Sequence, residues 1–394
     1  MTIDTTQGGG DGEGTGTEVP IVWNGRRVRA FVPAPIAGRE FVLRPATIRA
    51  TATAAADLIR GAADLPADFE PLARLLLRSE GVASSFIEGV HAPIVDVVLA
   101  EGAPGGPLTP ARWVAANLAA LSDALTDSTS SLSIAALLRW HDTLMQASPT
   151  PARHVGVLRT DQGWIGGTSP IDAALVTPPP ELVPGLLDDL VAFANRDDLD
   201  PIAQAAVAHA QFELIHPFAD GNGRVGRVLV WWLLARRMQH VSAPPISIVM
   251  ANDVGGYLAG LTMFRLGQRQ PWITWFAGAI SGASRAQTTL VNRVEKLREE
   301  WQSRLASPEV GRAPRRDSAA WRVLGLMPRH LVLTTDLVAR ELGNTRRAAH
   351  DTLRTLVAAG VVTEHLSPTT GTRGRPNRVY ISHDLLDLAT IGRT

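Results

Sequence analysis

The stretch HPFADGNGRVGR, residues 216–227, places three glycines, two arginines, a histidine, an aspartate and an asparagine in twelve positions between two apolar segments. Pro217 disfavours helical geometry at the residue before it, so the preceding helix is predicted to end there. Gly221 and Gly223 allow backbone angles that turn successive N–H groups toward one point. From Arg224 onward the pattern is helical, so the free N–H groups of a helix start face the same point. The stretch therefore predicts an anion site of the kind that binds phosphate.

The charged side chains of this stretch favour a nucleotide over a simple turn. Arg224 and Arg227 are three apart on a helix and can both reach distal phosphates. Asp220 is well placed beside an anion when a cation lies between them, which is how carboxylates hold Mg²⁺. His216 titrates near neutral pH and can take a proton from an attacking hydroxyl. The alternative is a glycine-rich turn with surface arginines, and His209, seven residues upstream, is expected to be a packed histidine and not a metal ligand.

Length and composition restrict the class of protein. A chain of 394 residues predicts two or three domains, and the absence of cysteine excludes disulfides, thiolate nucleophiles and Cys-ligated zinc. The formal net charge is zero, so no global attraction to nucleic acid or membrane is expected. We find no secretory signal, and the apolar run Val228–Ala235 is far shorter than the roughly 20 residues of a membrane span. A cytoplasmic enzyme or regulator without membrane attachment is expected.

Composition shifts divide the chain into five parts. The N-terminal residues are mainly Thr, Gly and acidic residues with little to bury, which predicts disorder. Asn24-Gly25 between two β-rich runs predicts a hairpin. We expect a disordered tail at 1–18, an N-terminal helical region at 19–110, a helical catalytic core at 111–305, a linker at 306–318 and a further domain at 319–394.

The C-terminal part is basic. Residues 312–394 hold thirteen arginines and no lysine against seven acidic residues. Two predicted helices meet at Gly343-Asn344, Thr345 is suited to cap the second, and two short strands follow, so this part resembles a winged helix-turn-helix. Such modules bind DNA, or else serve as dimerisation or docking units, and both readings stay open. The basic side chains that would meet DNA are Arg346, Arg347, His350 and Arg354 on the second helix and Arg373, Arg375 and Arg378 in the wing.

The motif at 216–227 resembles the complete signature of the Fic (filamentation induced by cAMP) family, most of whose known members are AMP-transferases acting on proteins. The resemblance covers most of residues 20–300 and implies a mostly α fold, in which a helical catalytic core carries a β-hairpin flap and the winged helix-turn-helix follows. It implies ATP as substrate and Mg²⁺ as cofactor. The roles it implies are those of a base for His216, a Mg²⁺ ligand for Asp220, a phosphate cradle for Gly221, Asn222 and Gly223, a grip on the β- and γ-phosphates for Arg224, and a loop anchor for Phe218.

A second stretch, SSFIEG at 84–89, is similar to the inhibitory helix motif of the same family. The resemblance implies that Ser84, Glu88 and Gly89 belong to this motif and that Glu88 pairs with Arg227 and blocks the γ-phosphate site. A bidentate Arg–carboxylate pair in a partly buried cleft must break before phosphate can bind. The alternative is a helix with a solvated Glu88 and with Gly89 as its C-cap.

Two further segments resemble parts of Fic proteins. VLRTDQGWIGG lies where the family has a flap that holds the target segment, with Trp164, Ile165 and Gly166 as the contact residues; a Trp that fills a gap under a loop is the alternative. NDVGGYLAGL resembles the helix that lines the adenine pocket, with Tyr257 as the stacking residue, although a Tyr at helical spacing is also typical of a core.

Together these features predict an autoinhibited protein adenylyltransferase that moves AMP from ATP to a Ser, Thr or Tyr hydroxyl of a target protein or of itself. Two alternatives stay open: a DNA-binding regulator that uses the nucleotide site as a sensor, and removal of AMP by the same site. The resemblance also leaves open whether the chain forms a homodimer.

Overall fold

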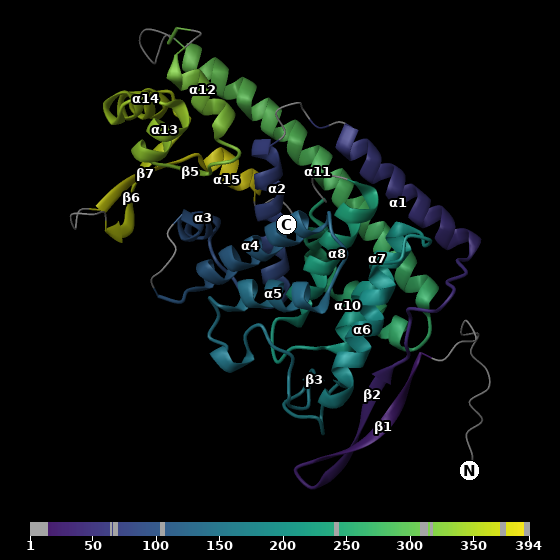
Figure 1. Ribbon diagram of the computed structural model, residues 1–394. Helices are drawn as coiled ribbons and strands as arrows, with labels where there is room; N and C mark the ends of the chain where they lie inside the picture. The colour runs from purple at the N-terminus through teal and green to yellow at the C-terminus, as the bar shows by residue number, and fades with distance from the viewer. Residues whose placement is uncertain are drawn as a thin grey trace.

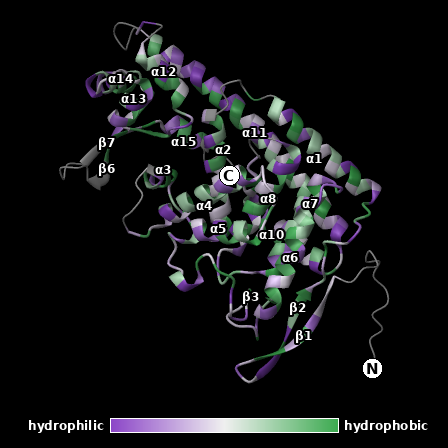
Figure 2. Ribbon diagram, viewed as in Figure 1, coloured by the Kyte–Doolittle hydropathy of each residue, from purple (hydrophilic) through white to green (hydrophobic). Residues whose placement is uncertain are grey.

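The computed structural model describes residues 15–63, 65, 70–102, 107–239, 244–307, 314–315, 318–370 and 376–389. The fold is mostly helical, and two helices occupy its centre, α7 (Pro201–Ile215) and α8 (Asn222–Met238). Both are buried along nearly their whole length because apolar residues cover every face. Hydrophobic residues occur along these two helices and along the helices around them (Figure 2). The motif at 216–227 joins them.

Other helices pack around this central pair (Figure 1). Thr109 caps one of them by accepting a hydrogen bond from the Arg112 amide, and Pro110 occupies its first position. The surrounding helices are α1 (Pro45–Ala63), α2 (Glu70–Ile87), α3 (Ile94–Gly102), α4 (Pro110–Asp127), α5 (Ile134–Met145), α6 (Val183–Ala194), α9 (Ile246–Asn252), α10 (Val254–Arg265) and α11 (Arg269–Ala306), with single 3₁₀ turns at Ala152–His154 and Pro180–Leu182.

Two hairpins lie at the lower end of the molecule in Figure 1. The first joins β1 (Gly16–Trp23) to β2 (Arg26–Pro33) through Asn24-Gly25, whose φ values of 46° and 78° suit the predicted two-residue turn. The second joins β3 (Trp164–Ile165) to β4 (Leu175–Val176) and is the predicted flap.

The predicted disordered tail is wrong at its C-terminal edge. Gly16, Thr17 and Glu18 belong to β1, where they pair with Pro33, Val32 and Phe31. The stabilising partners come from the second strand of the hairpin, and Glu18 binds Arg29 at 2.6 Å. The composition of residues 1–18 alone could not predict this pairing with β2. Residues 1–14 lie outside the described residues.

The described residues from 318 to 389 form what we call the C-terminal module. Its elements are α12 (Ala319–Leu326), β5 (Val332–Leu333), α13 (Thr335–Leu342), α14 (Arg346–Ala358), β6 (Thr363–Thr370), β7 (Pro376–Ile381) and α15 (His383–Ala389). The three strands form an antiparallel sheet in the order β5-β7-β6. Gly343 adopts a φ of 64°, and the Thr345 side chain accepts from the Ala348 amide, as predicted for the turn between α13 and α14. α12, β5 and α15 were not predicted from the sequence, and the winged-helix interpretation stays a prediction.

The buried hydrophobic residues of the described segments form two clusters. The first surrounds α7 and α8, and we call it the catalytic core after the core that the sequence predicts. The second, the C-terminal core, joins the C-terminal module to α11 and to parts of α2 and α3. The predicted linker at 306–318 falls between the end of α11 and the start of α12. The division of the chain into separate domains stays a prediction, because α2 and α11 contribute to the C-terminal core.

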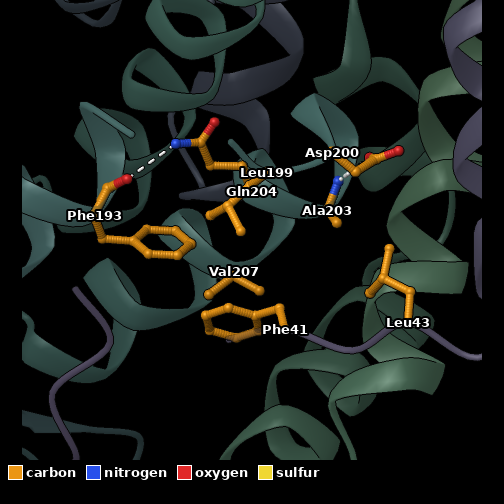
Figure 3. A pocket seen from close by; sticks show the side chains of 8 residues that line it. All are labelled: Phe41, Leu43, Phe193, Leu199, Asp200, Ala203, Gln204 and Val207. Atoms are coloured by element: carbon orange, nitrogen blue, oxygen red, sulfur yellow. Dashed lines mark hydrogen bonds between the residues drawn. The ribbon is translucent and has the colours of Figure 1, made fainter. Parts of the chain in front are cut away.

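A small cavity beside α7 is too small to be a ligand site. It lies among Phe41, Phe193, Val207 and their neighbours and measures about 20 Å³ (Figure 3). This volume holds about one water molecule. None of the helices among the described residues is long and apolar enough to cross a membrane.

Candidate active site

The loop between α7 and α8 is held in an unusual backbone shape. α7 ends at His216, which adopts left-handed angles (φ 50°), and Gly221 follows with φ 79°. Asn222 closes the loop on itself, because its Oδ1 accepts from the Phe218 amide and its Nδ2 donates to the Phe218 carbonyl, each at 2.9 Å. The Asn222 side chain therefore shapes the loop, and its backbone N–H is left for a ligand. The first N–H groups of α8 have no carbonyl one turn earlier to bond, so they form the predicted anion-binding end.

Phe218 anchors the loop in the core, as predicted. Its ring is 1% exposed and stacks on the ring of His141, with the centroids 3.8 Å apart and the planes nearly parallel. His141 Nδ1 accepts from the Gly156 amide at 2.9 Å, so Nε2 carries the proton and donates to the Asp220 carbonyl at 3.0 Å. Burial lowers the pKa of His141 to about 4, which keeps the ring neutral. The sequence analysis missed His141, because only the fold brings α5 against the loop.

The two arginines of the motif carry donors without protein partners. Arg224 is 2% exposed and lies over the ring of Trp113, while its Nε and NH1 atoms have no hydrogen-bond partner. Arg227 NH1 is also unpaired. A buried guanidinium donor without an acceptor is costly, so a site of this kind is suited to an anionic ligand that supplies the acceptors. These orphaned donors fit the phosphates of a nucleotide.

The remaining donors of Arg227 are occupied by the end of α2. Nε donates to Ser84 Oγ at 2.9 Å, and NH2 donates to the Ser84 carbonyl and to Glu88 Oε1, each at 2.8 Å. Burial alone would lower the pKa of Arg227, but Glu88, Tyr257 and Glu213 together raise it above its usual value. Glu88 Oε1 also covers Gly223, where a Cβ would approach to 2.1 Å. The structure thus brings Ser84 and Glu88 to the anion-binding end of α8.

Gly89 terminates α2. It adopts a φ of 75°, and its N–H and that of Val90 donate to the Phe86 and Ser85 carbonyls. This is the geometry of a glycine C-cap. The cap and the Glu88 contact are compatible, because the turn that ends the helix points the Glu88 carboxylate at Arg227.

His216 lies beside a buried arginine that the sequence analysis missed. Arg159 is 4% exposed and donates from Nε to the His216 carbonyl at 2.8 Å and from NH2 to the Pro178 carbonyl at 2.6 Å. Its NH1 donates to the Asp161 carbonyl at 2.9 Å. The same guanidinium therefore ties both ends of the flap to the end of α7, where backbone carbonyls favour a cation.

The His216 imidazole is neutral. Burial, assisted by the charge of Arg159, lowers its pKa to about 4, and its Nδ1 is buried without a partner. A neutral imidazole is the form that accepts a proton.

Asp220 lies at the open side of the loop, and its side chain is about half exposed. Oδ2 accepts from Thr150 Oγ1 at 3.0 Å, and Oδ1 accepts from the Gly221 amide at 2.6 Å. Arg224 NH2 is 3.8 Å from Oδ1. A partly exposed carboxylate beside unpaired guanidinium donors that could bind phosphate is suited to Mg²⁺. Most ligands of a bound Mg²⁺ are water molecules and phosphate oxygens, with one or two carboxylates from the protein.

The flap residues lie as predicted on a hairpin. Trp164 and Ile165 form β3 and are half-buried, and Gly166 follows with a φ of 70°. The Trp164 ring packs edge-on against Trp23 of the first hairpin, with centroids 5.6 Å apart. Both Trp164 and Trp23 are half-buried, so both predictions for Trp164 stay open, and the backbone of β3 remains the candidate for target pairing.

Tyr257 is buried and does not face open space. It is 3% exposed, its hydroxyl bonds His209 Nε2 at 2.8 Å, and its ring lies near Trp272 and Trp275. The predicted stacking on adenine has no support from this position, which is the core position that the sequence analysis gave as the alternative. His209 is fully buried beside it, as expected of a packed histidine.

The segment that carries this site matches a known family. Residues 131–234, from the start of α5 to most of α8, match the family model described as Fic/DOC family. Residues 131–234 form a Fic domain. The described loop, both arginines and His216 lie within this Fic domain, whereas Ser84, Glu88 and the C-terminal module lie outside it.

Curated relatives of the Fic domain are named as adenylyltransferases. The chain is 33% identical over 150 residues to protein adenylyltransferase fic-1 of Caenorhabditis elegans, which is 37% of this chain and 27% of that protein. It is 46% identical over 54 residues to the probable protein adenylyltransferase aq_aa38 of Aquifex aeolicus, which is 14% of this chain and 17% of that protein. The chain thus spans about a quarter or less of the length of these relatives.

A solved structure resembles a larger part of the chain. The crystal structure of a Fic family protein from Desulfovibrio desulfuricans G20 matches with a TM-score of 0.54 and 21% identity, and the match covers 87% of this chain and 97% of that one. At this identity the two proteins share the fold. The helical core that the sequence predicts is therefore a Fic-type fold.

Proposed function

We propose that this protein is an adenylyltransferase that moves AMP from ATP to a Ser, Thr or Tyr hydroxyl of a target protein or of itself. The observation that carries this proposal is the set of buried, unpaired guanidinium donors of Arg224 and Arg227 beside a neutral His216. Binding and positioning a triphosphate requires such donors, and the transfer itself requires one base. The curated names of the relatives support the same reaction class.

The reaction needs few groups. His216 accepts the proton of the target hydroxyl, and the hydroxyl oxygen forms a bond to the α-phosphorus of ATP. The bond from the α-phosphorus to the oxygen that bridges to the β-phosphate breaks, and pyrophosphate leaves with that electron pair. Arg224 and Arg227 would stabilise the charge that develops on the leaving phosphates, together with the N–H groups at the start of α8. Asp220 would hold Mg²⁺, which neutralises phosphate charge when bound.

The Glu88 contact supports an autoinhibited resting state. Glu88 Oε1 occupies a donor of Arg227 and covers Gly223, the two places at which a γ-phosphate would bind. A carboxylate and a phosphate compete for the same cation, and the pair must break before the phosphate can bind. Removal of the Glu88 side chain should therefore increase transfer.

The flap would position the target. β3 and β4 form a two-stranded sheet, so a strand edge is left on which an extended target segment can pair. Arg159 holds both ends of this hairpin against His216, so a segment bound there would lie near the base. The sequence of the target is not specified by these backbone contacts.

The test uses ATP labelled at the α-phosphate, and in parallel ATP labelled at the γ-phosphate, with Mg²⁺ and a cell lysate. The proteins compared are wild type, Glu88→Gly and Glu88→Gly/His216→Ala. We expect the α-label to appear on protein roughly tenfold more with Glu88→Gly, to fall by roughly 100-fold when His216 is also replaced, and the γ-label to stay in solution.

Other outcomes of this test favour the alternatives. Transfer of the γ-label would mean phosphorylation. If Glu88→Gly binds ATP but labels no protein, the nucleotide site acts as a sensor. Loss of AMP that had been attached beforehand would indicate the reverse reaction. Sedimentation of the wild-type protein tests whether it forms a homodimer.

A second candidate function concerns the C-terminal module. Arg346, Arg347 and Arg354 are exposed on α14, the helix that would enter the major groove if the module is a winged helix-turn-helix. Arg346 also pairs with Asp336 at 2.9 Å, and Arg378 pairs with Glu364 at 2.6 Å, so part of this charge is balanced within the module. Arg373 and Arg375 lie outside the described residues. DNA binding by this module is therefore a proposal that rests mainly on α14.

Duplex binding at different salt concentrations tests this second candidate. If α14 meets DNA, Arg347→Ala and Arg354→Ala should each weaken binding of a 20-base-pair duplex and lower its salt dependence by roughly one counterion. No binding of the wild type at low salt would exclude the candidate.

A further inference from the structure

Helix α2 belongs to both hydrophobic cores of the molecule. Near its start, Leu72, Leu75 and Leu76 are part of the C-terminal core. Farther along, Leu77 and Val82 are part of the catalytic core, and the side chain of Ile87 packs against it. In Figure 1 the helix lies between α15 of the C-terminal module and the helices around α8. One helix thus links the module to the residues that contact Arg227.

A polar contact strengthens the attachment of α2 to the C-terminal module. Arg78 is 5% exposed, and its NH1 donates to the Arg329 carbonyl at 2.6 Å, in the turn between α12 and β5. Its Nε donates to Glu101 Oε2 at 2.8 Å, and Arg74 binds Oε1 of the same carboxylate at 2.6 Å. Both arginines therefore hold α3, and Arg78 also binds the C-terminal module.

The other half of α2 is attached to the catalytic core by its acidic and hydroxyl side chains. Glu80 is fully buried and accepts from both the amide and the hydroxyl of Ser247 in α9. Ser84 and Glu88 bind Arg227. Glu80, Ser84 and Glu88 are spaced by four residues, so they follow one face of the helix toward the nucleotide site.

The middle of α2 has no exposed side on which it could bend. Every residue from Leu75 to Ser85 is buried. A close-packed interior has few alternative arrangements, so an element enclosed in this way moves as a unit or not at all. A change in the docking of the C-terminal module on Leu72, Leu75 and Arg78 therefore reaches Glu88, about three helical turns away.

We propose that α2 couples the C-terminal module to the Glu88 carboxylate, so that loosening the module from α2 withdraws Glu88 from Arg227 and opens the nucleotide site. This inference rests on the proposed function, in which Glu88 is inhibitory. Inhibition would be released when the face of the C-terminal module that contains Arg329 separates from α2. A ligand that binds the undocked module more tightly than the docked one would activate the enzyme, because it shifts the population toward the open state.

The test compares two substitutions on the same helix. Arg78→Gln removes the bond to the Arg329 carbonyl and one ion pair with Glu101, whereas Arg74→Gln removes only an ion pair with Glu101 and is the matched control. We measure hydrogen exchange of the amides at 81–90, ATP affinity and transfer of the α-label. We expect Arg78→Gln to increase all three by roughly fivefold or more, and Arg74→Gln to leave them near the wild-type values.

Each outcome of this test has one meaning. If Arg78→Gln matches Arg74→Gln in exchange and ATP affinity, the coupling is wrong, whether or not Glu88→Gly is active. If Glu88→Gly labels no protein, the proposed function fails, but exchange at 81–90 still decides the coupling. If circular dichroism shows that Arg78→Gln is unfolded, Asp384→Ala replaces it, because this partly exposed residue holds the module to Arg304 of α11 at 2.8 Å. Asp384→Ala should then increase exchange at 81–90, and an unchanged exchange would contradict the coupling.

Discussion

Individual residues in this protein serve the site through backbone contacts that no sequence motif marks. Arg159 bonds carbonyls at Asp161, Pro178 and His216, which are far apart in the chain and carry no special side-chain pattern. His141 holds the loop in the same way. The motif itself could be predicted because glycine-rich loops at the start of a helix, with basic side chains nearby, recur in the phosphate sites of many proteins. Residues that act through main-chain carbonyls of other segments can be found only once the fold is known.

The charge of Arg159 has a testable effect on the base. In the Glu88→Gly protein, Arg159→Gln removes a cation beside His216, so the pKa of His216 should rise by roughly one unit from about 4. The His216 ring is then protonated at a higher pH, so the acid limb of the pH–rate profile shifts to higher pH. Arg159→Lys keeps the charge and should keep the limb while raising the KM for the target. A limb that stays in place in Arg159→Gln would contradict this role.

The Gly223 position tests how close Glu88 lies to the loop. A Cβ there would approach Glu88 Oε1 to 2.1 Å, so Gly223→Ala cannot keep the Glu88–Arg227 contact of the wild type. We expect faster exchange at 81–90 in Gly223→Ala and no such change in Gly185→Ala, where a Cβ meets nothing within 4 Å. Equal exchange in both proteins would show that Glu88 does not cover Gly223.

At the scale of elements, the sequence predicted most helices and both hairpins, because caps, turns and apolar periodicity are local. Thr345 and Asn24-Gly25 act as predicted. The errors concern elements stabilised by distant partners. Gly16–Glu18 joins β1 because β2 supplies its ladder, and Tyr257 turns inward because His209 accepts or donates at its hydroxyl. Neither partner is visible in the local pattern.

The attachment of α2 to α9 makes stability depend on pH. Burial raises the pKa of Glu80 to about 7, so the folded state prefers the protonated acid. The stabilisation is complete below the unfolded pKa near 4.5 and is lost as the pH rises through 7. The free energy of unfolding of wild type should fall between pH 5 and pH 8, whereas that of Glu80→Gln, whose side chain stays neutral, should fall less. The difference between the two changes should be on the order of 3 kcal/mol at pH 8.

Urea unfolding of both proteins at the two pH values measures this difference. The matched control is Glu18→Gln, an exposed glutamate in the hairpin, which should follow the wild type. A parallel pH dependence in Glu80→Gln and wild type would mean that Glu80 is not the group responsible.

For the whole molecule, the two cores and the helix between them make nucleotide binding and module docking mutually dependent. If ATP must displace Glu88 and Glu88 moves with α2, then ATP must also weaken the docking of the C-terminal module, because coupling between two sites is reciprocal. ATP should therefore increase hydrogen exchange at 72–78 and at 329–333 in the wild type. In Glu88→Gly, ATP has no carboxylate to displace, so its effect on these segments should be absent. An equal effect of ATP in both proteins would contradict the reciprocity.

The central claim is that residues 216–227 hold a triphosphate for which Glu88 is the competing anion. Calorimetric titration of ATP with Mg²⁺ into wild type, Glu88→Gly and Glu88→Gly/Arg224→Ala measures it directly. We expect Glu88→Gly to bind ATP roughly tenfold or more tightly than wild type, and Arg224→Ala to reverse this gain because the phosphates lose two hydrogen-bond donors, Nε and NH1 of Arg224. Equal affinities in wild type and Glu88→Gly, or an Arg224→Ala change without effect, would contradict it.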